Sequence, residues 1–288
     1  MRPTTRHALQ ILGVTAVILA LWQVCLRGFG WEARFAESNY FANRIRMEEY
    51  LFRGAAPKHV LVGSSLSGRL LPEYFAGTAL SNFATLGLDG SIPLVGLDVL
   101  GRRPDLPSVV FVETYLVEKD WGTNDWLLIE GLESPGTTLA RHVPMARASR
   151  RPTSLLYSAV KLRKESGGGG LIETNAPGVR EPGPMMEVGT PAEALVAKWR
   201  ERMKELKERG VRVVFVDLPG GELRMPGPRR APDLVDRLVT EFGAVRIDLR
   251  TEWFGRGWLP RYTDGRHLDA GSARVTAELL AQRMAKGI

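Results

Sequence analysis

Five short apolar segments alternate with segments of helical periodicity between about residues 59 and 284, and this alternation restricts the possible folds more than any other feature. The apolar segments are four to seven residues long, at 59–62, 80–85, 109–115, 211–217 and 245–249. Runs that are apolar at nearly every position are typical of strands buried on both faces of a parallel sheet. The sequence therefore predicts an α/β fold, with a doubly wound, flavodoxin-like, five-stranded parallel sheet and helices on both faces.

The N-terminal segment is uncharged over nineteen residues, from Ala8 to Leu26. A helix of this length spans roughly 28 Å, close to the thickness of a hydrocarbon core. Arg2 and Arg6 precede it, which favours a cytoplasmic N-terminus, and no small-x-small cleavage site follows it. We therefore expect a single-pass membrane anchor in residues 1–30, with the domain in residues 31–288 on the extracytoplasmic (periplasmic or extracellular) side.

Composition excludes several classes of protein. The 288 residues are 44% hydrophobic, enough for one large α/β domain. Cys25 is the only cysteine, so no intramolecular disulfide can form. The net charge of +7 is scattered, and the most charged segment, Lys198–Arg209, alternates bases with acids as a solvated helix face does. We expect no nucleic-acid partner.

Helical and strand periodicity fade between Trp121 and Gly189, which we interpret as an irregular insertion in the domain. Within it, Gly167–Gly170 is a tetraglycine that no Gly-Lys-Ser/Thr follows. A flexible linker therefore explains it better than a phosphate-binding loop does. We expect no cofactor.

The first predicted strand ends in Gly63-Ser64-Ser65-Leu66, and a short apolar-periodic segment follows. In an open parallel sheet, ligands bind at the carboxyl ends of the strands. Backbone N–H groups at the start of a following helix favour negative charge there. This placement suits a nucleophilic serine, while the alternative is a serine that only caps the helix.

A nucleophilic serine needs a base, and the chain has four histidines. His7 flanks the anchor, His142 lies in the insertion, and His59 begins the first strand, at the opposite edge of the sheet. His267 lies on the loop before the last helix, at the same edge as Ser65, and is the candidate by elimination.

Asp264 precedes His267 by three residues. A carboxylate at this spacing can accept a hydrogen bond from one imidazole nitrogen, which leaves the other nitrogen to deprotonate serine. In the alternative interpretation, the two residues are only neighbours in a turn before a helix.

These residues together resemble the SGNH (GDSL-type) hydrolase family over about residues 58–284. The family's first block is Gly-Asp-Ser-Leu, here Gly63-Ser64-Ser65-Leu66, with Ser64 in place of the aspartate. Its second block supplies a glycine after the second strand, here Gly87, and its last block is Asp-x-x-His, here Asp264 and His267. The resemblance implies a catalytic triad of Ser65, Asp264 and His267, with Gly87 in the oxyanion hole.

The family's third block is Gly-x-Asn-Asp directly after the third strand, and its asparagine donates to the oxyanion. Here that strand ends in Glu113-Thr114-Tyr115, and a literal Gly122-Thr123-Asn124-Asp125 comes several residues later. Asn124 is therefore one candidate donor. Backbone N–H groups of Ser65 and Gly87, with Thr114 or Tyr115 nearby, are the alternative.

The resemblance implies a membrane-anchored serine esterase or O-acyltransferase that forms an acyl-enzyme on Ser65. Its substrates would be acyl esters, such as the acetyl esters of an envelope glycan, and its partners an envelope acyl-transfer machinery. The alternative is a catalytically inactive module of the same fold that binds a partner or glycan in such a system.

Overall fold

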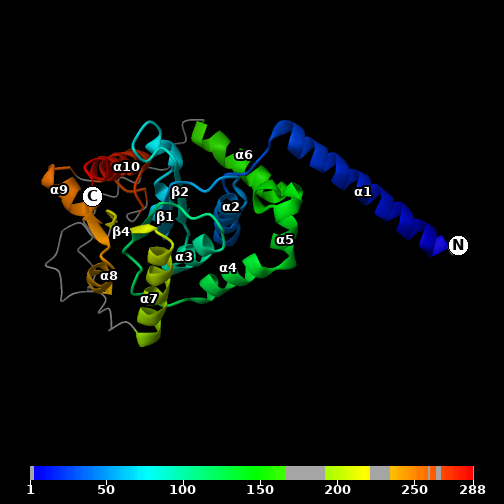
Figure 1. Cartoon of the computed structure of the whole chain (residues 1–288). Helices are drawn as coiled ribbons and strands as arrows, with labels where there is room; N and C mark the ends of the chain where they lie inside the picture. The colour runs from blue at the N-terminus through cyan, green and yellow to red at the C-terminus, as the bar shows by residue number, and fades with distance from the viewer. Residues whose placement is uncertain (1–2, 167–191, 221–233, 259, 264–266, 288) are drawn as a thin grey trace.

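The computed structural model describes residues 3–166, 192–220, 234–258, 260–263 and 267–287 (Figure 1). It confirms an α/β fold with a five-stranded, all-parallel sheet in the order β2-β1-β3-β4-β5. Each of the five strands ends in a glycine or an acidic residue, and those ends share one edge of the sheet. The strands are β1 (His59–Gly63), β2 (Phe83–Gly87), β3 (Val109–Glu113), β4 (Arg212–Asp217) and β5 (Val245–Asp248).

Ten α-helices and four short 3-10 helices lie in the described part of the chain. The α-helices are α1 (Pro3–Phe29), α2 (Asn39–Phe52), α3 (Pro93–Gly101), α4 (Thr123–Glu133), α5 (Pro135–His142), α6 (Pro152–Ser166), α7 (Glu193–Glu208), α8 (Leu234–Phe242), α9 (Leu249–Gly255) and α10 (Ala270–Ala285). The 3-10 helices are η1 (Ser67–Arg69), η2 (Pro72–Phe75), η3 (Pro144–Ala146) and η4 (Ala148–Arg150).

Two hydrophobic cores lie on opposite faces of the sheet, because successive side chains of a strand point to opposite faces. Val60 and Val62 of β1 belong to the core that α3, α7 and α8 cover, and Trp199 of α7 is its largest fully buried side chain. Leu61 belongs to the other core, which η2, α9 and α10 cover. Figure 1 shows α7 and α10 on opposite sides of β4.

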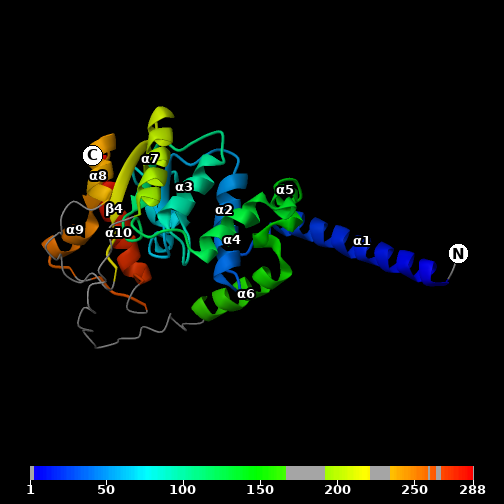
Figure 2. The same cartoon turned by 90° about the horizontal axis from the view of Figure 1, so that it is seen from below.

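Helix α1 projects away from the rest of the chain in both views (Figures 1 and 2). Its segment Thr5–Leu26 has a mean hydropathy of 2.1, and only 6% of that apolar window is buried. It is long and apolar enough to cross a membrane. Phe29 and Trp31 stack at its C-terminal end with ring centroids 5.1 Å apart, where aromatic side chains suit a membrane–water interface.

The expected irregular insertion is wrong for residues 123–166, which form α4, α5 and α6. Helix α4 contacts α2 and α3, and its Leu128, Ile129 and Leu132 belong to the core that α3 covers. Helices α5 and α6 follow it beside α2 (Figure 2). Buried Glu48 of α2 accepts a hydrogen bond from the N–H of Ala148 at 2.7 Å, and Arg44 donates to the carbonyl of Gly131 at 3.2 Å. Polar contacts to α2 thus replace part of the apolar face by which these helices would otherwise pack. The helical spacing of apolar residues is therefore weak in this part of the sequence. The tetraglycine Gly167–Gly170 lies outside the described residues.

Three local predictions also need correction. Strand β2 begins and ends later than expected, because its pairing with β1 extends to Gly87. The sequence Ser91-Ile92-Pro93 predicts a helix with a capping serine, but Ser91 does not cap α3, because its hydroxyl donates to the carboxylate of Asp125. Part of the expected loop after β5 is helix α9, because Trp253 is buried against α10 and donates to Thr276 Oγ1 at 3.1 Å.

Candidate active site

The turn after β1 differs from the helix start that the sequence suggested. Only the short 3-10 helices η1 and η2 lie between β1 and β2, so no α-helix begins at the turn that carries Ser65. The neighbouring Ser64 makes the local turn contact, because its Oγ accepts a hydrogen bond from the N–H of Leu66 at 3.2 Å. Neither serine caps η1 with its side chain: Ser64 supports the turn, and Ser65 makes a different contact.

Ser65 and His267 meet at this edge although 202 residues separate them in the sequence. Nε2 of His267 lies 2.7 Å from Oγ of Ser65, and both residues are half-buried. This is hydrogen-bond distance for a serine and the base that would remove its proton. The predicted meeting of these two residues is therefore confirmed.

A short antiparallel contact between Tyr262 and Leu268 carries His267 to this position. The carbonyl of His267 accepts a hydrogen bond from the N–H of Thr263 at 2.9 Å. Next to it, Asp269 caps α10 by accepting from the N–H of Ser272 at 2.6 Å. The loop is thus fixed at both ends. Asp264, the predicted third member of the triad, lies outside the described residues.

Gly87 supports the turn from the β2 side. A Cβ at Gly87 would lie 2.1 Å from the backbone nitrogen of Gly68, so only glycine allows η1 and β2 to approach so closely. The N–H of Gly87 donates to Thr85 Oγ1 at 3.2 Å. Gly87 therefore acts on the backbone geometry of the turn, and its N–H already has an acceptor on its own strand.

Asn124 is near the start of α4, beside the loop that follows β2. A Cβ at Gly90, which has a φ of +73°, would lie 3.9 Å from Asn124 Nδ2. The buried carboxylate of Asp125 holds the two segments together, since it accepts from Ser91 Oγ and from the N–H of Gly122 at 2.7 Å. The literal Gly-Thr-Asn-Asp thus joins α4 to the loop after β2, only three residues beyond Gly87.

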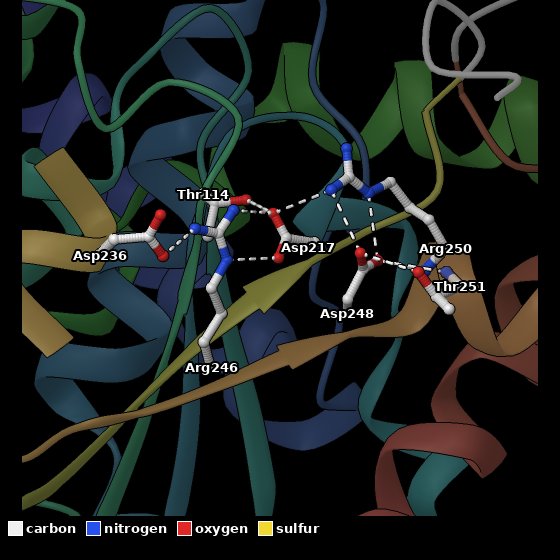
Figure 3. Close-up of polar contacts among 7 residues, drawn as sticks. All are labelled: Thr114, Asp217, Asp236, Arg246, Asp248, Arg250 and Thr251. Atoms are coloured by element: carbon white, nitrogen blue, oxygen red, sulfur yellow. Dashed lines mark hydrogen bonds and ion pairs between the residues drawn. The ribbon is translucent and has the colours of Figure 1, made fainter. Parts of the chain in front are cut away.

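Thr114, the alternative oxyanion donor, belongs to a charged network at the ends of β3, β4 and β5 (Figure 3). Its hydroxyl donates to the buried Asp217 at 2.6 Å. Arg246 binds Asp217 from the other side with two hydrogen bonds of 2.8 and 3.0 Å, and also contacts Asp236 at 2.7 Å. Because the Thr114 hydroxyl already donates its hydrogen to the Asp217 carboxylate, Thr114 is a weaker candidate than Asn124 for donating to an oxyanion. Tyr115 is exposed.

Sequence reasoning missed Glu113, which is fully buried at the end of β3, beside the Ser65 turn. Its carboxylate accepts hydrogen bonds from both Ser64 and Ser67. Burial raises the pKa of the Glu113 carboxyl, and these hydrogen bonds act in the opposite direction. The sequence feature that could have indicated Glu113 is its position as the one acidic residue at the end of the otherwise apolar segment Val109–Glu113.

No group of three or more His, Cys, Asp or Glu in the described ranges is arranged to hold a metal ion. Comparison with known proteins adds no family, since no protein-family model, curated protein or solved structure matches the chain.

Proposed function

We propose that the protein is a membrane-anchored serine esterase or O-acyltransferase of the SGNH type. The observation that carries this proposal is the 2.7 Å contact between Ser65 Oγ and His267 Nε2 at the carboxyl edge of a parallel sheet. Histidine and serine at this distance are the minimum pair for nucleophilic catalysis on an ester.

The strand order supports a doubly wound, flavodoxin-like arrangement. The chain passes from β1 to β2 and then returns across β1 to β3, β4 and β5. The connection from β1 to β2 contributes to one core, whereas α3, α7 and α8 contribute to the other. Winding in two directions creates a switch point between β1 and β3, where ligands bind in such folds. Ser65 follows β1 and Glu113 ends β3, so the proposed site lies at that point.

In the proposed reaction, Nε2 of neutral His267 takes the proton of Ser65 while Oγ attacks the ester carbonyl. The tetrahedral intermediate then expels the alcohol, which receives the proton from His267, and the acyl group remains on Oγ. Water or a second hydroxyl attacks this acyl-enzyme, and His267 again moves the proton. Asp264 orients the imidazole, and Asn124 donates to the oxyanion.

Esterase and transferase share the acyl-enzyme and differ only in the acceptor. The resemblance to envelope-modifying proteins suggests acetyl esters of a surface glycan as substrates. The apolar, exposed α1 supports a membrane anchor, and an extracytoplasmic domain would bring the site to such a glycan. An inactive binding module remains the second candidate, supported by the absence of an asparagine directly after β3.

The test is labelling of the full-length protein in detergent micelles by a fluorophosphonate probe, with the modified residue mapped by mass spectrometry. We expect labelling at Ser65, and a loss of ester hydrolysis of roughly 10⁴–10⁶-fold in Ser65→Ala and in His267→Ala. The double variant should be little worse than either single variant, because the two groups act as one unit.

Ser81→Ala and His142→Ala are matched controls, since both residues are exposed. They should retain wild-type activity. A folded wild type that shows neither labelling nor hydrolysis would favour the binding module. Full activity in folded Ser65→Ala would refute the nucleophile.

A further inference from the structure

The buried carboxylate of Glu113 binds both ends of the turn that carries Ser65. Oε2 accepts from the N–H of Ser64 at 2.9 Å, from the N–H of Ser67 at 3.1 Å, and from the Ser67 hydroxyl. Oε1 accepts from the Ser64 hydroxyl at 2.7 Å. Glu113, Ser64 and Ser67 are all buried. One side chain thus holds the residues before and after Ser65-Leu66.

The end of β1 is shaped around this carboxylate. A Cβ at Gly63 would lie 2.4 Å from Glu113 Oε2 and 2.2 Å from Ser67 Oγ, so no larger residue fits there. On the opposite side of the turn, Gly87 meets the backbone of Gly68. The turn is therefore confined between β3 and β2, and Glu113 is its polar support.

Burying a carboxylate is costly unless its oxygens are well satisfied. Four donors from two residues offset part of that cost, and such a network makes the surrounding backbone rigid. Rigidity has a chemical use at this turn, because Ser65 Oγ must stay within hydrogen-bond distance of a histidine on a distant loop.

We propose that Glu113 is a positioning residue: it fixes the Ser64–Ser67 turn so that Ser65 Oγ stays aligned with His267 Nε2. The inference rests on the proposed function, in which Ser65 is the nucleophile. It assigns Glu113 no contact with substrate.

The division of donors between the two oxygens makes the proposal specific. In Glu113→Gln, the amide oxygen can take the place of Oε2 and keep three donors, while the amide NH2 replaces Oε1. The Ser64 hydroxyl can then accept instead of donate. In Glu113→Asp, the carboxylate is withdrawn by about one bond length, roughly 1.5 Å, so it cannot reach both serines.

The experiment compares Glu113→Gln and Glu113→Asp in the full-length protein, with Glu48→Asp as the matched control. Glu48 is also a buried carboxylate with a backbone N–H donor, but it lies on α2. The rate of fluorophosphonate labelling is measured against probe concentration, and hydrogen exchange is measured on the peptide that spans residues 59–70.

We expect Glu113→Asp to lower the maximal labelling rate by about 10²-fold without changing the half-saturating probe concentration. Exchange at the Ser64 and Ser67 amides should become faster. Glu113→Gln should restore the rate to within about tenfold of wild type, and Glu48→Asp should leave both readouts unchanged. A purely structural role would slow Glu113→Asp and Glu48→Asp alike.

Wild-type labelling in a folded Glu113→Asp variant, or equal slowing in both aspartate variants, would overturn the proposal while leaving Ser65 as the nucleophile. If Glu113→Asp does not fold, Ser67→Ala is the second variant. It removes one of the four donors, the Ser67 hydroxyl, and should slow labelling about tenfold. An unchanged rate there would also overturn it. If the wild type is never labelled, the proposed function fails, and the proposal that Glu113 positions a nucleophile fails with it. Faster hydrogen exchange at the Ser64–Ser67 turn in Glu113→Asp than in Glu48→Asp would still show that the carboxylate holds the turn.

Discussion

Gly87→Ala should displace the turn that carries Ser65, because the added methyl group meets backbone atoms of Gly68. The new Cβ would lie 2.1 Å from Gly68 N and 2.5 Å from Gly68 Cα. Ordinary contacts of a Cβ begin near 3.4 Å, so β2 or the turn must move by roughly 1 Å. Because the opposing atoms are backbone, no change of rotamer relieves the contact.

Two consequences follow from a shift of this size. Overpacking a close contact typically costs about 1–3 kcal/mol in the free energy of unfolding, and a backbone neighbour places Gly87→Ala at the upper end, about 3 kcal/mol. A misalignment of about 1 Å between reacting groups costs roughly 10²-fold in rate. We therefore expect both lower stability and slower labelling of Ser65.

The assay is urea unfolding of the full-length protein in detergent micelles, followed by circular dichroism, together with the labelling rate at Ser65. Gly54→Ala is the control, because no heavy atom lies within 4 Å of its new Cβ and Gly54 has no positive φ. That variant should be neutral or more stable by up to about 1 kcal/mol. Equal stability of the two variants, with full labelling in Gly87→Ala, would refute the close approach of β2 and η1.

Three further predictions concern the oxyanion donor, the buried carboxylate and the anchor. Asn124→Ala should lower turnover by about 10²–10³-fold with little change in KM, and an unchanged rate in ester hydrolysis would direct attention to Tyr115. Burial raises the pKa of Glu113 above its ordinary value of 4.5, so ionisation of this carboxyl lowers the stability of the folded wild type. Glu113→Gln cannot ionise, so its stability relative to wild type should increase as the pH rises through the folded-state pKa. A difference in urea midpoints that does not change with pH would contradict this. A reporter enzyme fused after Ile288 should be active only in its extracytoplasmic form, whereas a cytoplasmic signal would reverse the predicted topology.

The strands were predictable because their signal is local. Val60–Val62 and Val109–Val112 are continuous apolar runs, and a run of this kind buries itself on both faces wherever the sheet places it. The helices beside α2 were not predictable in the same way. Residues 123–166 depend on contacts such as Glu48 to Ala148, which link positions 100 residues apart and leave no periodic trace.

In the candidate site, too, some features follow from the local sequence and others from contacts between distant residues. The sequence by itself determined that a serine follows the first strand and that His267 lies on a loop at the same edge, because strand direction decides which loops share an edge. Only the tertiary structure decided the 2.7 Å contact between them, the close approach of Gly87 to Gly68, and the burial of Glu113 under Ser64 and Ser67. Those contacts join residues from 19 to 202 positions apart. The pairing of β1 with β2 and β3, together with the loop that brings His267 to the end of β1, creates them, and no local sequence pattern does.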